Sequence, residues 1–567
     1  MDKTRRFALF ALMTLTGCSE SSGGLDPEMP APDGGMTPDG ASPDSGNDDL
    51  VLAYNFVSMW ASSTVERRVH SDGSESLHGE TLVDLSLMAP IVLRAIEDVD
   101  LDADGVLKSA DIHILNTIGD VESAKRIQLD PEAGEVRISR HAGMFVWEVP
   151  NDVPWAYYHF ASDAYLGLHT SSPVAAWVNA RATEASETLR GIVYDALYAE
   201  PIPSESLYQE STLVIGADAA NLDDEFVENV VIGQLGDFLY RTDEDLGDLL
   251  DFTVEEGTEA IAPPDCALPG AAQDFAVPSA DGTMIAGTVN LPPGAAGQIP
   301  FVVVNFGTGG CDRDCPMAGK PALACLAKPL LDAGFGVVRY DDRGRGQSGG
   351  EMATLTFNMR GDDATAVAAM AAGRADLDPD ALFLLGWSEG VAHASVAAAR
   401  VPEVDGLLFM AGVGKSFAAA MPEQGDVYLA SYGMPQAFID MSHNQSQMFV
   451  NQILAGTFPA PMVGTLPVEY FRQAFQSDGG ALAAAGARPT VIFQGRDDWQ
   501  VPEDNADLLA AALGGAGVVD VSVHRYDTGH AFVPTVPGFP SGEEYFLPLA
   551  FDPAFLGDLV AWVNAHR

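Results

Sequence analysis

The chain has few basic residues for its length, and this scarcity limits what it can bind. Of its 567 residues, 29 are lysine or arginine and 81 are aspartate or glutamate, so the formal net charge is −52. Nucleic-acid binding needs a basic surface, so we expect no nucleic-acid partner. Long apolar runs are also missing, and none approaches the ~20 residues of a membrane-spanning helix. The 47% of apolar residues can nevertheless bury a large core, and the length predicts more than one domain.

The first residues have the pattern of an export signal. Three of the first six are basic, residues 7–12 are apolar, and the letters LTGC follow, ending at Cys18. This pattern resembles the bacterial lipoprotein signal. The resemblance implies a signal peptide over 1–17, a lipid on Cys18 and a membrane anchor in the bacterial envelope. The serine after the cysteine then favours the outer membrane, on its periplasmic or its cell-surface face.

Composition divides the rest of the chain into three parts. Residues 18–49 are rich in proline, glycine, serine and aspartate, which predicts a disordered acidic linker. Two domains are expected beyond it, over 50–265 and 266–567, because a regular alternation of strands and helices begins near residue 266.

Cysteine is rare, and export changes how the remaining cysteines are interpreted. Cys266, Cys311, Cys315 and Cys325 can form two disulfides in an oxidising compartment, with three possible pairings. We choose no pairing. A metal site is the weaker interpretation, because no histidine lies near them in the sequence.

An acidic stretch in the first domain, DLDADGVLKSAD over 100–111, has the spacing of a calcium loop. Calcium takes six to eight oxygen ligands, and a glycine at the sixth position permits the tight turn that gathers them. The candidate ligands are the carboxylates of Asp100, Asp102, Asp104 and Asp111 and the backbone carbonyl of Val106.

We expect helices over 88–99 and 110–118, on either side of this loop. The loop resembles an EF-hand, and more closely the dockerin variant, which ends in aspartate. Dockerins carry two such loops and this chain has one, which leaves a single structural calcium site and no partner protein that the sequence identifies. The alternative is an aspartate-rich turn. Residues 50–265 otherwise indicate a mixed α/β domain whose function the sequence does not reveal.

The second domain alternates apolar strands with alanine-rich helices. The predicted strands cover 287–291, 301–306, 336–340, 382–386, 406–410, 490–494 and 519–526. Continuous apolar runs are typical of strands buried on both faces, so we expect a doubly wound, mostly parallel sheet. Catalytic residues on such sheets follow the carboxyl ends of the strands.

One strand end carries a nucleophile motif. The strand over 381–385 runs into GWSEG, with Ser388 at its centre, and an alanine-rich helix follows. Small residues on either side of the serine permit the strained turn that exposes its hydroxyl. The turn also directs the positive end of the helix toward a developing oxyanion.

Serine needs a general base, and the base needs an acid to orient it. Asp498 and His530 follow the strands over 490–494 and 519–526, in the chain order that this fold uses. Asp497 is the alternative acid and His524 the alternative base. His393, on the helix after Ser388, is interpreted as structural.

The oxyanion hole requires two N–H donors. We expect one from the backbone of Glu389 and the other from the glycine-rich loop after residue 306, with Thr308 as donor and Gly309 as the alternative. The Glu389 carboxylate would oppose an oxyanion unless it were neutralised. We therefore predict an ion pair between Glu389 and either Arg313 or Arg343.

Four motifs together resemble the α/β-hydrolases, and most closely bacterial serine esterases. They are GTGGCDRD at 307–314, YDDRGRGQS at 340–348, GWSEG at 386–390 and GRDDWQVP at 495–502. The last motif independently selects Asp498. Trp387 stands where the family usually has histidine, which implies a changed pocket rather than lost activity. The resemblance is confined to the C-terminal half of the chain.

An insertion over 415–488 is rich in methionine and aromatic residues. At this point of the fold it could form an apolar cap that accepts an acyl chain, or its apolar residues could pack helices together.

These features predict a serine hydrolase that cleaves small carboxylic esters through an acyl-enzyme and needs no cofactor for catalysis. Cleavage of amides or peptides by the same residues is one alternative. A surface ligand-binding protein with an inert hydrolase half is the other.

Overall fold

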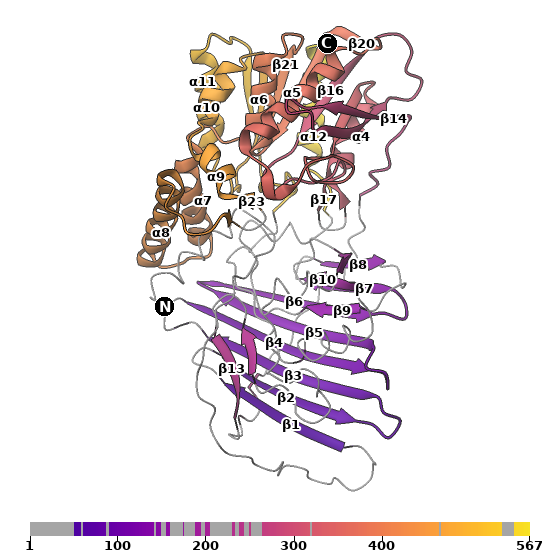
Figure 1. The fold of residues 1–567 in the computed structure, drawn as a ribbon, viewed down its shortest axis with the longest axis vertical. Coiled ribbons are helices and arrows are strands. Elements are labelled where there is room, and N and C mark those ends of the chain that lie inside the picture. Colours follow the sequence, from indigo (N-terminus) through magenta and orange to yellow (C-terminus); the bar gives the residue numbers. More distant parts are fainter. Residues whose placement is uncertain are drawn as a thin grey trace. The chain divides into compact units, whose positions relative to one another are not determined.

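The computed structural model contains two compact units (Figure 1), which comprise Ser19–Ile261 and Ala262–Arg567. The described residues are 50–140 except 58–60, 85 and 87–89, short segments between 143 and 250, and 264–567 except 318–319, 464–465 and 536–548. The predicted signal peptide over 1–17, the linker over 18–49 and the lipidation site Cys18 lie outside the described residues. Among the described residues, no helix is both long and apolar enough to cross a membrane.

The first unit is built on a ten-stranded sheet in the order β12-β13-β1-β2-β3-β4-β5-β6-β7-β8, in which every neighbouring pair is antiparallel. Its strands are β1 (Leu50–Val57), β2 (Ala61–Val69), β3 (Glu75–Asp84), β4 (Ile91–Leu101), β5 (Leu107–Ile118), β6 (Val121–Asp130), β7 (Glu135–Arg140), β8 (Gly143–Glu148), β12 (Asn229–Ile232) and β13 (Asp237–Thr242). A smaller sheet contains β9 (Trp155–Tyr158), β10 (Thr188–Val193) and β11 (Ala199–Pro203).

Two predictions for this unit are wrong in the part that is described. The segments predicted as helices over 88–99 and 110–118 lie largely in β4 and β5, which pair as a hairpin. The residues alternate between one buried and one more exposed face, with Ile91, Leu93 and Ala95 pointing to the core. A repeat of two residues is the repeat of a strand, so these segments have a strand pattern rather than the predicted helical one. The expectation that this unit mixes helices and strands stays a prediction.

The predicted calcium site is also not formed by its expected ligands. Asp102 accepts the backbone N–H groups of Asp104 and Val106 and so closes a hairpin turn. Asp100 accepts hydrogen bonds from serine hydroxyls on the neighbouring strands, and Asp111 forms an ion pair with Arg126 at 2.6 Å. Within the described residues, no group of three metal-ligating side chains converges. Extended strands separate the carboxylates that a helix–loop–helix would gather.

The second unit contains an eight-stranded sheet in the order β14-β15-β19-β16-β20-β21-β24-β25. Its strands are β14 (Ala271–Pro278), β15 (Met284–Leu291), β16 (Ile299–Asn305), β19 (Gly336–Tyr340), β20 (Leu377–Trp387), β21 (Gly406–Met410), β24 (Thr490–Gly495) and β25 (Val521–Tyr526). The pairs from β19 to β25 are parallel, and the first two pairs are antiparallel. The predicted mostly parallel sheet is confirmed.

Helices cover both faces of this sheet, since every residue of β19, β21 and β24 is buried. They are α4 (Ala322–Asp332), α5 (Phe357–Ala372), α6 (Gly390–Arg400), α11 (Asp504–Gly515) and α12 (Pro553–Ala565). Neighbouring residues of β20 point to opposite faces. Phe383 packs against Trp562 of α12, whereas Leu384 joins the core that α5 and α6 complete.

The insertion between β21 and β24 is mainly helical. It contains α7 (Phe417–Ser431), α8 (Gln436–Ala455), the short strands β22 (Met462–Val463) and β23 (Leu466–Pro467), α9 (Val468–Phe475) and α10 (Gly479–Ala485). Most of its apolar side chains are buried against one another, including Met421, Phe449 and Phe471. Among the described methionines and aromatic residues of the insertion, only Met441 and Met448 are exposed. The structure therefore favours helix packing as the main role of these side chains.

The four cysteines of this unit form two disulfides. Cys266 pairs with Cys325 and joins the segment before β14 to α4, and Cys311 pairs with Cys315 inside the loop after β16. The second bond closes a small ring in the loop that was predicted to supply an oxyanion donor.

Candidate active site

Ser388 lies at the tip of a strained turn between β20 and α6. Its φ angle is 58°, in the left-handed region that serine rarely adopts. A Cβ atom on Gly386 would come within 2.6 Å of the Gly390 carbonyl oxygen, and one on Gly390 within 2.3 Å of the Asn305 carbonyl oxygen. Only glycine fits at these two positions, so the motif's glycines are required by the close packing of strand and helix.

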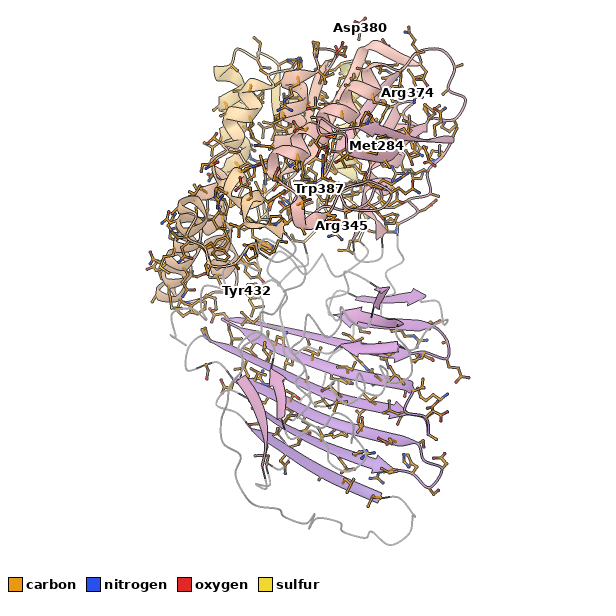
Figure 2. All side chains as sticks on the ribbon, viewed as in Figure 1. Met284, Arg345, Arg374, Asp380, Trp387 and Tyr432 are labelled. Atoms are coloured by element: carbon orange, nitrogen blue, oxygen red, sulfur yellow. A yellow bond between two sulfur atoms is a disulfide. The ribbon has the colours of Figure 1, made fainter. Side chains whose placement is uncertain are left out.

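Asp498 and His530 meet beyond the ends of β24 and β25. Their side chains are buried, and Nδ1 of His530 lies 2.8 Å from Oδ2 of Asp498. Asp498 also accepts hydrogen bonds from the Val501 amide and the Gln494 side chain, which fix its orientation. Trp387, labelled in Figure 2, donates from its indole to the carbonyl oxygen of His530 at 3.2 Å. This bond joins the histidine loop to the residue that precedes Ser388.

The alternative acid and base have other partners. Asp497 accepts a hydrogen bond from Thr535, and His524 forms an ion pair with Asp558 at the edge of the sheet. Neither residue is bonded to His530 or Asp498 in the described structure.

The loop after β16 lies directly against the nucleophile. A Cβ atom on Gly307 would be 3.0 Å from the Cβ of Ser388 and 3.4 Å from its Oγ. Thr308 donates from its hydroxyl to Oε2 of Glu389 at 2.9 Å, so the loop and the elbow are bonded together. Gly309 has a φ of 91°, which turns the chain away. Among the described residues, the backbone amides of Thr308 and Glu389 donate to no acceptor.

This loop is held in place by the YDDRGRGQS motif. Arg313 forms a bidentate ion pair with Asp341, and its backbone amide donates to the same carboxylate. The amide of Cys311 donates to Asp342. These charge-assisted bonds anchor the second half of the loop, so Asp341 and Asp342 support the position of the oxyanion donors.

The prediction that Glu389 forms an ion pair with Arg313 or Arg343 is wrong. Arg313 is bound to Asp341, and Arg343 is bound to Asp281 and Asp363. Both arginines belong to loops that the sequence places close to the elbow, but each has a nearer carboxylate.

Arg360 of α5 is the guanidinium that neutralises Glu389, at 2.9 Å. Tyr470 of α9 and Nε2 of His393 also donate to the same carboxylate, and all four side chains are buried. Burial raises the pKa of Glu389, but the hydrogen bond from His393 and the charge of Arg360 lower it to about 2. Burial lowers the pKa of His393, so its ring is neutral. The carboxylate is therefore ionised, and both of its oxygens accept hydrogen bonds.

Sequence reasoning missed Arg360, although α5 contains a signal for it. Arg360 shares the helical spacing of Phe357, Ala364 and Val367, which are buried. A charge on the apolar face of a helix must be paired, because an isolated buried charge is very costly.

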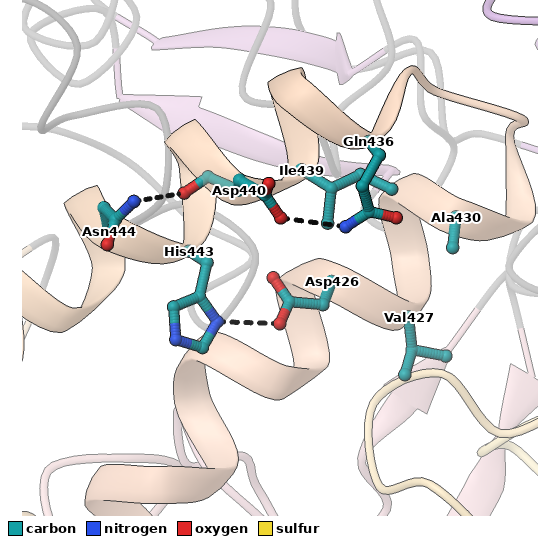
Figure 3. Close-up of a pocket in the computed structure, with 8 residues that line it drawn as sticks. All are labelled: Asp426, Val427, Ala430, Gln436, Ile439, Asp440, His443 and Asn444. Carbon is teal, nitrogen blue, oxygen red and sulfur yellow. Dashed lines mark hydrogen bonds and ion pairs between the residues drawn. The ribbon is translucent and has the colours of Figure 1, made fainter.

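A pocket of about 600 Å³ lies elsewhere, between α7 and α8 of the insertion (Figure 3). Its lining is largely polar and includes His443, whose Nδ1 is 2.7 Å from Oδ2 of Asp426. None of the predicted site residues lines it. The insertion does contact the acid loop, because Tyr428 of α7 packs against Trp499 with ring centroids 4.5 Å apart.

Comparison with known proteins agrees with this architecture. Residues 322–530, which span Ser388, Asp498 and His530, match the family model described as Serine aminopeptidase, S33. Together with the sheet order, this match identifies the C-terminal unit as an α/β-hydrolase fold. No curated protein matches the chain.

Similar solved structures cover the same half of the chain. An esterase from Pyrococcus furiosus is 14% identical with a TM-score of 0.36, covering 52% of this chain and 91% of its own. The α/β hydrolase GrgF from Penicillium sp. sh18 is 15% identical with a TM-score of 0.37, covering 52% and 99%. Est1E from Butyrivibrio proteoclasticus, solved with ferulic acid bound, is 12% identical with a TM-score of 0.34, covering 51% and 98%.

Proposed function

We propose that this protein is a serine hydrolase that cleaves small carboxylic esters through Ser388, His530 and Asp498. The observation that carries the proposal is the buried hydrogen bond between His530 and Asp498, at the same end of a parallel sheet as the strained turn bearing Ser388. A serine hydroxyl becomes nucleophilic when an oriented imidazole accepts its proton.

The reaction has two halves. Ser388 Oγ attacks the ester carbonyl carbon while His530 takes the hydroxyl proton, and the backbone amides of Glu389 and Thr308 stabilise the oxyanion, with Gly309 as the alternative donor. The bond to the leaving oxygen then breaks, and His530 returns the proton to the departing alcohol. Water then attacks the acyl-enzyme carbonyl while His530 takes its proton; the bond to Ser388 Oγ breaks as His530 returns that proton to Oγ, and the carboxylic acid leaves. This route needs no cofactor.

The name of the matching family favours a second candidate, removal of amino-terminal residues from peptides. An aminopeptidase must bind the substrate's ammonium group, usually through a carboxylate with spare hydrogen-bonding capacity. The carboxylate next to the nucleophile, Glu389, is instead bound by Arg360, Thr308, Tyr470 and His393. The oxygens of Glu389 are therefore occupied, so Glu389 is a poor site for a peptide's ammonium group.

We further propose that the protein is exported and anchored by a lipid on Cys18, in the bacterial outer membrane. The LTGC pattern at the end of an apolar signal supports this, as does the pairing of all four remaining cysteines, since disulfides persist in oxidising compartments.

A fluorophosphonate probe tests the proposed nucleophile. We expect it to label the wild-type protein but not Ser388→Ala, and kcat on p-nitrophenyl esters to fall by about 10⁴-fold or more in that variant. Ser395→Ala is the matched control, because Ser395 is buried on the following helix and bonds only to the Val391 carbonyl. It should be labelled like the wild type.

Substrate class is tested by comparing p-nitrophenyl esters with aminoacyl p-nitroanilides. A higher kcat/KM on the esters supports the proposal, whereas a higher value on the anilides would replace it with the peptidase. Absence of both labelling and hydrolysis would leave the hydrolase half inert and favour a ligand-binding protein.

A further inference from the structure

Arg360 contacts both segments that are predicted to supply the oxyanion donors, the loop after β16 and the side chain of Glu389. Its guanidinium is 4% exposed. One terminal nitrogen donates to the carbonyl oxygen of Gly307 at 2.6 Å and to Glu389 at 2.9 Å, and the other donates to the carbonyl of Phe306 at 3.1 Å and to Asp342 at 2.9 Å. A single planar group thus connects the loop after β16 to the nucleophile turn.

The bond to Gly307 determines where the next amide points. The carbonyl of Gly307 and the N–H of Thr308 belong to one planar trans peptide group, in which they point in opposite directions. Because Arg360 holds the carbonyl, the Thr308 N–H is directed to the other side of the loop. Gly307 packs against Ser388, so the loop holds this amide close to the reacting hydroxyl.

The bonds to Glu389 act on the second donor. Its backbone amide begins α6 directly after Ser388, and its side chain is held by Arg360 and by the hydroxyl of Thr308. Arg360 also neutralises the carboxylate, which would otherwise place an uncompensated negative charge beside a developing oxyanion. Orientation and charge compensation therefore come from the same side chain.

We propose that Arg360 is the positioning residue of the oxyanion hole. Its bond to the Gly307 carbonyl orients the Thr308 amide, and its bond to the Glu389 side chain holds the second donor in place. The inference rests on the proposed esterase function. Loss of Arg360 should therefore lower kcat more than it raises KM, because a misaligned donor weakens binding of the tetrahedral intermediate far more than binding of the ester.

The test compares Arg360→Met and Arg360→Lys with Arg343→Met in the full chain. Arg343 is the matched control, since it is equally buried and ion-paired with Asp281 and Asp363 but contacts neither Glu389 nor the loop carbonyls. Measurements are kcat and KM on one p-nitrophenyl ester, and the Ki of the matching trifluoromethyl ketone, which forms an anionic tetrahedral adduct with serine. Circular dichroism gives the folded fraction for each variant.

For Arg360→Met we expect kcat to fall by about 10²-fold and Ki to rise by a similar factor, with KM changed by less than about 3-fold. Arg360→Lys keeps the charge but loses the planar fork, so it should recover part of kcat and remain below the wild type. Arg343→Met should change kcat only a little once the value is corrected for the folded fraction.

Two outcomes separate this inference from the proposed function. If the wild type hydrolyses esters and folded Arg360→Met and Arg360→Lys retain kcat and Ki within about 3-fold, the positioning role is overturned and the esterase stands. If Arg360→Met is unfolded, Arg360→Lys alone decides by the same criterion. If the wild type hydrolyses no ester and takes no fluorophosphonate, the proposed function fails and the inference fails with it.

Discussion

The two units of this chain both rest on large sheets, but only one sheet gathers its polar residues at a single place. In the ten-stranded sheet of the first unit the strands are antiparallel, so successive loops alternate between two opposite edges. Its charged groups pair locally, as Arg126 does with Asp111 on the neighbouring strand. In the second unit parallel strands end at one edge, where Ser388, Asp498 and His530 follow three different strands.

The two units also differ in how their charged side chains are buried and paired. Around the elbow, Arg360, Glu389 and Asp342 are buried and bonded on several sides. In the first unit, pairs such as Arg126–Asp111 and Arg68–Glu66 are partly or largely exposed, whereas Arg67–Glu75 is buried. Buried pairs hold loops in one geometry because leaving either partner alone is costly, whereas exposed pairs contribute little. The comparison teaches that, among the described residues, the buried pair of the first unit joins two neighbouring strands, whereas the buried charges around the elbow hold loops together.

The largest expected effect tests whether the parallel edge carries catalysis. Asp498→Asn should lower kcat on esters by about 10⁴-fold, because the neutral amide no longer holds the imidazole in the productive tautomer. The neighbouring Asp497→Asn is the control, since Asp497 bonds to Thr535 rather than His530. Steady-state kinetics on both variants measure the difference. Equal losses of kcat in the two variants would contradict the assignment of Asp498 as the acid that orients His530.

The next prediction, with a smaller expected effect, tests whether the first unit contributes to catalysis. Leu93 is fully buried in β4, so Leu93→Ala should lower the free energy of unfolding of that unit by about 3 kcal/mol. We expect kcat/KM on esters to remain unchanged, as measured below the unfolding transition. Leu50→Ala, at a half-exposed position of the same sheet, is the control and should cost far less. Loss of activity in folded Leu93→Ala would contradict the separation.

The smallest effect tests the buried charge beside the nucleophile. The pKa of Glu389 is about 2 in the folded protein, below its ordinary value of 4.5. Its ionised form therefore stabilises the fold above about pH 4.5, and this contribution disappears as the pH falls toward 2. Between these values the wild type should lose about 2 kcal/mol more than Glu389→Gln in chemical denaturation.

The control for that comparison is Glu351→Gln, which removes a carboxylate from the exposed surface. A wild type and Glu389→Gln with identical pH dependence would show that the Arg360 pairing does not stabilise the ionised carboxylate.

Much of the second unit was predictable from local pattern. Seven of the strands in its sheet were expected from apolar runs bounded by turn residues, and only β14, whose residues are mostly exposed, was not. Ser388, Asp498 and His530 were chosen because each follows such a strand in a recognisable motif. The first unit was misread because β4 was assigned a helical period, although Ile91, Leu93 and Ala95 recur every second residue.

By itself, the sequence determined which segments become strands of the C-terminal sheet and which motifs stand at their ends, because strand formation and tight turns depend on short-range patterns. Only the tertiary structure decided which cysteines pair, that the predicted calcium ligands stay apart, and that Arg360 rather than Arg313 or Arg343 meets Glu389. These outcomes depend on which distant segments are brought within a few ångströms, and the packing of helices against the sheet determines that distance.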